Sequence, residues 1–183
     1  MLILYMTPKI IIHFWFTECG QKEWFQKNAH FDETIRGRFL ESYWDVANGK
    51  MAAWRNTPEG RLAEILLLDQ CARNMFREQP QAFLNDPLAL TLAEEAVQVG
   101  DDKKLPPLLR QFIYMPYMHS ESRNVHMKAL SLFEELGDPS ALRYELRHKE
   151  IIDRFGRYPA RNHALGRVST PEELEYLDTH EEF

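Results

Sequence analysis

Five dipeptides that join a threonine or an aspartate to a proline do most to restrict what this chain can fold into. Each places a side-chain oxygen, able to accept a hydrogen bond from an unpaired backbone N–H, directly before a proline. Proline has no N–H to lose at the first position of a helix, so the dipeptide marks a helix start. The five are Thr7-Pro8, Thr57-Pro58, Asp86-Pro87, Asp138-Pro139 and Thr170-Pro171. Half of the 10 prolines are thereby predicted to begin helices.

Glycines follow several of these segments, at positions where a left-handed residue can end a helix. They are Gly49, Gly100, Gly137 and Gly156. Because no alternating strand pattern of useful length competes, the sequence predicts an all-α fold of about eight helices. The predicted ranges are 8–18, 32–48, 58–75, 87–99, 106–113, 121–136, 139–155 and 171–178.

The predicted helix over 58–75 is apolar on nearly all sides, which indicates that it runs through the centre of the fold. Asp69 and Arg73 nevertheless lie on the same stripe as Leu62, within about 20° of it at 100° per residue. Their spacing of four residues lets them pair with each other, and a buried charge without a partner is costly. We therefore expect Asp69 to be buried and paired with an arginine. The pair is either purely structural or the floor of a polar pocket.

A histidine lies within the apolar face of the predicted helix over 139–155. That face consists of Tyr144, Ile151, Ile152 and Phe155, and His148 is near its centre. The imidazole is either a hydrogen-bonded core group or a group available for catalysis, since it titrates near neutral pH.

A second histidine lies in the segment YMPYMHSES, over residues 114–122. Here Ser120 is expected to cap the following helix, and Glu121 suits the positive end of its dipole. These roles leave His119 without an explanation. It is therefore another candidate for an acid–base group.

Basic residues are concentrated over 143–167, where seven Lys or Arg and three Asp or Glu give a balance of +4 in a chain of net charge −6. Arg154, Arg157 and Arg161 surround a glycine and a proline in this stretch. Guanidinium groups bind carboxylate or phosphate through two parallel hydrogen bonds. We expect an anion site at Arg157 and Arg161, unless these arginines clamp acidic groups of the same chain, such as Asp69 or Glu121.

Charge and cysteine content narrow the class of protein. The net charge of −6 argues against a nucleic-acid partner. Two cysteines far apart in the sequence and no His-x-x-x-His pair predict neither a metal site nor a cofactor. The apolar start MLILYM is too short for a membrane span and lacks the features of a signal peptide. We expect a cytoplasmic protein without a membrane partner, with an apolar extension over 1–7 and a single helical domain over 8–183.

Four stretches together resemble the motifs of a known family. They are FWF at 14–16, LLLDQCARNMFR at 66–77, FIYMPYMHSE at 112–121 and IIDRFGRYPARNHALGR at 151–167. The sequence from about 8 to 178 is similar to the bacterial domain-of-unknown-function family 924. The resemblance implies a tetratricopeptide-repeat-like array of antiparallel helix pairs around a concave face. It implies no activity, because none is established for the family.

The family's motif residues correspond here to a set that includes the histidines and arginines discussed above. The set is Asp69, Gln70, Arg73, Asn74, His119, Ser120, Glu121, His148, Arg154, Arg157, Arg161 and Asn162. This chain departs from the pattern at Cys71 and Ala72, where Phe and Pro are more frequent. It departs again at Ala160, which often is His, and this weakens any mechanism that needs a histidine there.

Three functions are compatible with these residues. The first is binding of a small anionic ligand or an acidic peptide end, in a pocket lined by Arg73, Asn74, His119, Glu121, His148, Arg157, Arg161 and Asn162. The second is catalysis at the same place, with His119 or His148 as general acid or base beside Asp69. The third is a helical scaffold for a partner protein, in which these residues are structural. From their positions on helix stripes and beside loops, we expect at least four of Asp69, Arg73, His119, His148 and Arg161 to meet in one polar cluster.

Overall fold

The computed structural model describes residues 6–25 and 27–179, and these form helices without any strand. The all-α fold expected from the sequence is thereby confirmed. Residues 1–5, which make up most of the predicted extension, lie outside the described residues, as do 180–183. No helix in the described part is long and apolar enough to cross a membrane.

The N-terminal part consists of α1 (Pro8–His13), a π-helical turn at Phe14–Glu18, the short α2 (Gln21–Phe25) and α3 (Ala29–Ala47). The first two elements form the helix predicted over 8–18. α3 begins three residues earlier than predicted, because the Asn28 side chain accepts hydrogen bonds from the N–H groups of His30 and Phe31. α2 was not predicted, since five residues are too few to show a helical period.

The predicted central helix runs through α4 (Pro58–Ile65), a π-helical turn at Leu66–Cys71, and α5 (Ala72–Met75). Every side chain from Leu62 to Ala72 is buried, which confirms its central place. It contacts α1, α3, α6 (Asp86–Gln98) and α7 (Pro107–Met118).

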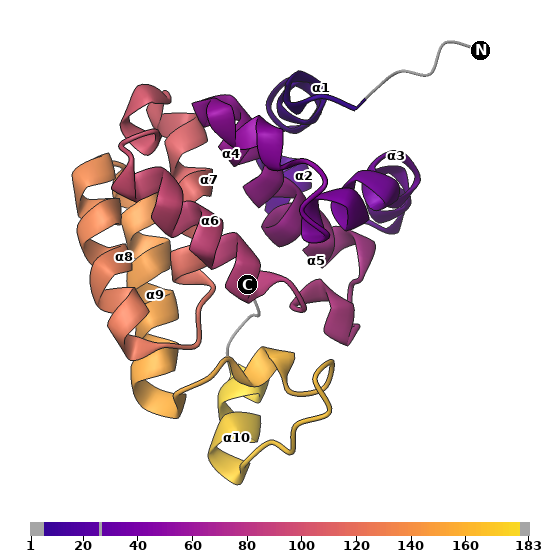
Figure 1. Cartoon of the computed structure of the whole chain (residues 1–183). Helices are drawn as coiled ribbons and strands as arrows, with labels where there is room; N and C mark the ends of the chain where they lie inside the picture. Colours follow the sequence, from indigo (N-terminus) through magenta and orange to yellow (C-terminus); the bar gives the residue numbers. More distant parts are fainter. Residues whose placement is uncertain (1–5, 26, 180–183) are drawn as a thin grey trace.

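The rest of the chain is a series of helices that pack on their neighbours in sequence order: α6, α7, α8 (Arg123–Leu136) and α9 (Pro139–Phe155). Figure 1 shows α8 and α9 side by side, and α10 (Pro171–Thr179) beyond the end of α9 with the segment that leads to it. Single 3₁₀ turns lie at Ala52–Asn56, Pro80–Ala82, Asp102–Lys104 and Pro159–Arg161. α7 continues past the predicted end at 113, through Pro116, because Tyr114, Tyr117 and Met118 extend its buried face.

The Thr/Asp–Pro dipeptides begin helices as predicted, but they do not all cap them. The side chains of Thr57, Asp138 and Thr170 accept hydrogen bonds from backbone N–H groups of the first turn. Thr7 makes no such bond, and Asp86 lies one residue inside α6, where its carboxylate has other partners. At the other ends, Gly137 and Gly156 are left-handed, with φ of 76° and 72°.

One predicted face was wrong in detail. Tyr144 of α9 is 46% exposed, and the buried positions are Glu145, His148, Ile151 and Ile152. The other buried positions agree with the prediction, and Glu145 takes the place of Tyr144 because it has a buried partner on α8, His126. Sequence periodicity cannot reveal such a partner.

Two glycines in helices offer a test of the packing. A Cβ atom on Gly60 would lie 1.8 Å from the Trp54 carbonyl oxygen, whereas a Cβ on the exposed Gly37 meets nothing within 4 Å. We expect Gly60→Ala to lower the free energy of unfolding by about 1–3 kcal/mol through overpacking. Gly37→Ala should raise it by about 0.5–1 kcal/mol. Urea unfolding of both variants measures this, and equal effects would contradict the close approach of the 52–56 turn to α4.

Candidate functional site

The candidate site begins at Asp69, which the π-helical turn of the central helix places in the protein interior. The turn covers Leu66–Cys71, and the Asp69 side chain is almost completely buried. Turns of this kind widen a helix locally and occur often at functional sites. Here the turn carries an acidic side chain within an otherwise apolar stretch, so Asp69 must find its partners inside the fold.

Three side chains satisfy the Asp69 carboxylate. Oδ1 accepts from Nδ1 of His119 at 2.7 Å and lies 3.2 Å from a terminal nitrogen of Arg73, while Oδ2 accepts from the Gln70 amide at 2.6 Å. Burial alone raises the pKa of Asp69, but Arg73 and His119 outweigh it and hold the pKa well below its ordinary value. The carboxylate is therefore ionised, and the expectation that Asp69 is buried and paired with an arginine is confirmed.

Arg73 makes its contacts inside the fold through both terminal nitrogens of its guanidinium. Besides Asp69 Oδ1, it donates to the carbonyls of Asp69 and Ala82, at 3.1 and 3.2 Å, and to both carboxylate oxygens of Asp86, at 3.0 Å each. Burial lowers the pKa of Arg73, while Asp69 and Asp86 more than reverse the effect and raise it. Five acceptors for one guanidinium make Arg73 a structural tie between the central helix and the start of α6.

Asp86 is the residue of this cluster that sequence reasoning misassigned. It was expected to cap α6, but Asn85 stands at the cap position, and the Asp86 carboxylate binds Arg73 and, at 3.3 Å, Arg161. An Asp–Pro dipeptide looks the same whether its carboxylate caps a helix or binds arginines. The sequence held no signal that distinguished the two.

Arg161, in the 3₁₀ turn after α9, lies against Asp86 from the other side. Its guanidinium is held between the rings of Phe83 and Tyr158, at 4.8 and 4.4 Å from their centroids. It donates to the His119 carbonyl at 2.9 Å and to Asp86. Burial and the charge of Arg73 lower the pKa of Arg161, yet an arginine stays protonated at any physiological pH.

His119 lies at the C-terminal end of α7, and its carbonyl oxygen accepts the hydrogen bond from this arginine. Because Nδ1–H donates to ionised Asp69, the neutral ring carries its lone pair on Nε2. No described residue is within hydrogen-bonding reach of that nitrogen, and the side chain is 12% exposed. Burial lowers the pKa of His119, with a contribution from Arg73, while Asp69 acts in the opposite direction.

His148 of α9 completes the cluster, since its ring centroid lies 6.2 Å from that of His119. Its Nδ1 donates to the Tyr144 carbonyl at 2.8 Å, and burial lowers its pKa to about 3, so the ring is neutral. Asp69, Arg73, His119, His148 and Arg161 therefore meet, as the sequence predicted.

Three of the expected ligand residues have acidic partners elsewhere. Asn74 donates to Asp32 of α3 at 2.9 Å, on another side of the central helix. Arg157 donates to both carboxylate oxygens of Glu173, at 2.6 and 2.7 Å, and Asn162 reaches the same carboxylate at 3.3 Å. Arg157 and Asn162 thereby attach the segment after α9 to α10, and a ligand contact by any of the three residues stays a prediction.

Glu121 and Ser120 also differ from their expected capping roles. α8 begins after Ser122, the last residue of the motif HSES and two residues later than the predicted start, because the chain first makes a loop. Glu121 faces away from α8 and binds Arg167 at 2.7 and 2.9 Å, as well as the backbone N–H of Tyr158. Among the motif arginines considered earlier, none was the partner of Glu121.

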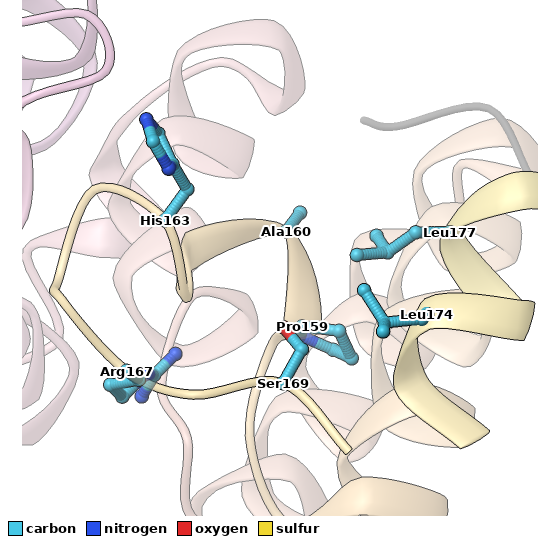
Figure 2. Close-up of a pocket in the computed structure, with 7 residues that line it drawn as sticks. All are labelled: Pro159, Ala160, His163, Arg167, Ser169, Leu174 and Leu177. Atoms are coloured by element: carbon cyan, nitrogen blue, oxygen red, sulfur yellow. The ribbon is translucent and has the colours of Figure 1, made fainter. Parts of the chain in front are cut away.

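A hollow of about 400 Å³ lies between the segment after α9 and α10. It is lined by Pro159, Ala160, His163, Arg167, Ser169, Leu174 and Leu177. Figure 2 shows the two leucines pointing from α10 toward Pro159 and Ala160. None of these residues belongs to the cluster around Asp69, so this hollow is not the pocket that the sequence predicted.

Comparison with known proteins bears on the family and the fold. The family described as "Bacterial protein of unknown function (DUF924)" matches residues 11–181, and a search of curated proteins gives no match. A solved structure of a protein of unknown function from Agrobacterium tumefaciens is 36% identical, with a TM-score of 0.89. The similarity covers 94% of this chain and 97% of that one. The expected resemblance is confirmed, and neither description names a ligand or a reaction.

The buried carboxylate gives a prediction for stability. Asp69→Asn removes the charge that Arg73 and His119 face, so we expect the free energy of unfolding to fall by about 3–5 kcal/mol. Asp153→Asn is the control, because that carboxylate is exposed and pairs with Lys149 on the same helix. It should change stability by about 1 kcal/mol or less. Urea unfolding at neutral pH compares the two, and equal effects would show that the Asp69 pair is dispensable.

The lowered pKa of Asp69 predicts that the stability of the fold decreases at acidic pH. The pKa of Asp69 in the folded state is lower than in the unfolded state, so its contribution is complete above about pH 4, near the ordinary pKa of aspartate. The contribution is lost as the pH falls below that value toward the folded-state pKa. Unfolding curves collected over this range should be less steeply pH-dependent for Asp69→Asn than for the wild type.

Proposed function

The chain belongs to the bacterial protein family of unknown function DUF924, and we propose that the cluster around Asp69 gives it a binding site for a small anionic ligand. The ligand's carboxylate or phosphate group would be held by Arg161 and His119. Asp69, Arg73 and Asp86 would hold these two side chains in place.

The observation that carries this proposal is the unequal use of two neighbouring arginines. A guanidinium has five N–H donors. Arg73 meets five acceptors within the fold, whereas Arg161 meets two among the described residues, Asp86 and the His119 carbonyl. Arg161 lies between two rings and is 13% exposed. This packing restricts the guanidinium and its unused donors, which reduces the entropy lost when an anion binds.

The charge of the cluster explains why a histidine belongs to the site. Asp69 and Asp86 balance Arg73 and Arg161, so the cluster is neutral while both histidines are neutral. A bound anion adds negative charge, which favours protonation of His119 at its open Nε2. The C-terminal end of α7 also favours a cation at this position. Binding of the anion should therefore be coupled to uptake of a proton by His119.

A thermal-shift screen tests the binding. The anions are phosphate, mono- and dicarboxylates, and one short peptide with either a free or an amidated C-terminus, all at constant ionic strength. A ligand at 100 times its Kd adds about 2.7 kcal/mol to stability, which for a chain of this length raises Tm by about 5–10 °C. Arg161→Ala should lose this increment relative to its own Tm. The exposed Arg154, from the same basic stretch, provides the control Arg154→Ala, which should keep it.

Calorimetry in two buffers with different ionisation enthalpies tests the proton. Burial lowers the pKa of His119 in the free protein, and a bound anion raises it. Proton uptake on binding is therefore expected at pH values between the His119 pKa of the free protein and that of the complex. Affinity should fall as the pH rises through the pKa of the bound state. If no anion shifts the wild type, or if Arg161→Ala responds equally, the arginines are structural and a scaffold for a partner protein becomes the better hypothesis.

A second function, catalysis, is favoured by the pair of Asp69 and His119. A carboxylate that accepts from Nδ1–H keeps the lone pair on Nε2 and stabilises the imidazolium that forms when Nε2 takes a proton. His119 would then act as general base toward water or a substrate hydroxyl, beside the positive charge of Arg161. His148 is the other candidate acid–base group in reach of the cluster.

Hydrolysis of esters and phosphate esters that contain a binding anion tests this second function. We expect turnover that falls about 10²–10⁴-fold in His119→Gln. The rate should increase with pH through the pKa of His119, since the neutral ring is the base. If an anion binds at Arg161 but wild type and His119→Gln turn it over equally, catalysis by His119 is rejected. The proposal of a binding site then remains.

A further inference from the structure

The loop that carries His119 is held by side chains at three consecutive carbonyl oxygens. It connects α7 to α8, over residues 119–122. The Met118 carbonyl accepts from the Tyr158 hydroxyl, the His119 carbonyl from Arg161 at 2.9 Å, and the Ser120 carbonyl from Nε2 of His126 at 2.9 Å. The position of the His119 imidazole therefore depends on donors that come from α8 and from the segment after α9.

The hydrogen bond from His126 to the Ser120 carbonyl shows which ring nitrogen of His126 carries a proton. A carbonyl oxygen only accepts, so Nε2 of His126 must carry hydrogen. Its other nitrogen, Nδ1, lies 2.8 Å from Oε1 of Glu145 on α9. Two such atoms at this distance need a proton between them. The pair of Glu145 and His126 therefore holds one, and it is uncharged as a whole whether the proton belongs to the carboxyl or to the imidazole.

The surroundings of the pair favour a proton on the Glu145 carboxyl group rather than on Nδ1 of His126. Both side chains are completely buried, and Oε2 of Glu145 has no hydrogen-bond partner among the described residues. An ionised carboxylate with an unsatisfied oxygen in the interior is costly, and the carbonyl oxygen of a neutral acid is much less so. Burial also raises the pKa of Glu145, while His126 and Lys149 act against it. The other titratable groups near the pair are Tyr158, whose hydroxyl is 3.1 Å from Nε2, and His148.

We propose that Glu145 and His126 are positioning residues for His119. Glu145, as a neutral acid, donates to Nδ1 of His126, which keeps the tautomer whose Nε2–H holds the Ser120 carbonyl. The histidine ring thereby transmits the protonation of a buried acid to the backbone next to His119. The consequence for ligand affinity rests on the proposed function, whereas the protonation and the position of His119 do not.

Glu145→Gln is the variant that separates the possibilities. The glutamine amide can donate to Nδ1 as the neutral acid does, so this variant should keep the tautomer of His126, the titration of His119 and the Tm at neutral pH. Glu145→Ala removes the donor and should shift the titration of His119 and weaken phosphate binding about tenfold or more. Glu150→Gln, on the exposed side of the same helix, is the control and should change nothing.

Imidazole nitrogen NMR of the full chain without ligand is the primary measurement. In the wild type near neutral pH, His126 should be neutral with hydrogen on Nε2. A cationic His126, or a Glu145→Gln variant that shifts His119 as much as Glu145→Ala does, would overturn the proposal in favour of an ion pair. An unchanged His119 titration in Glu145→Ala would also overturn it. If Glu145→Ala does not fold, the wild-type spectrum and Glu145→Gln still decide. If phosphate fails to bind while the NMR results hold, only the proposed function falls.

Discussion

An ionised carboxylate in the middle of a central, apolar helix is the constraint on which the rest of this structure depends. Asp69 cannot reach water, so it draws the guanidinium of Arg73 into the fold. Arg73 needs more acceptors than Asp69 provides and takes Asp86 from the next helix. The second oxygen of Asp86 then attracts Arg161. Charges of alternating sign thus follow one another along the series, and each neutralises the one before it. The last guanidinium, that of Arg161, meets only two acceptors among the described residues, which is why a binding site would form at this end of the series.

The structure contains two pairs of a carboxyl group and an imidazole, and the two carboxyl groups differ in ionisation. In both, a carboxylate oxygen lies 2.7 or 2.8 Å from Nδ1 of a histidine. Asp69 has the positive charge of Arg73 in contact and is ionised, so His119 keeps an open lone pair on Nε2. Glu145 has no arginine in contact, and burial dominates its pKa. The same arrangement of atoms can therefore present a basic nitrogen in one place and a hydrogen-bond donor to the backbone in the other. The difference is set by a single neighbouring cation.

The parts of the fold that could be predicted from the sequence are those that local chemistry decides. Helix starts follow from proline and a capping oxygen, and the position of Asp69 and Arg73 follows from helical period alone. Asp86 could not be assigned, because the helix cap and the arginine ligand have the same local sequence. His126 and Glu145 were missed for a related reason. They lie on different helices, each looks like an ordinary polar residue of an amphipathic helix, and only packing brings them together. Long-range polar pairs of this kind leave no periodic signal.

The segment after α9 shows how residues outside the cluster decide its geometry. Gly156, left-handed at the end of α9, turns the chain back toward α7. Arg157 then fixes the turn to α10 through Glu173, whose carboxylate also accepts the backbone N–H of Thr170. Burial opposes ionisation of Glu173, but the hydrogen bond from Arg157 dominates and lowers its pKa to about 2, so the tie persists at any physiological pH. Arg157 is thus held by a carboxylate that it contacts through two nitrogens, while Arg161, four residues further, lies between Phe83 and Tyr158 and shares Asp86 with Arg73. Two arginines that look alike in sequence thus divide the work: one anchors the segment and the other is presented by it.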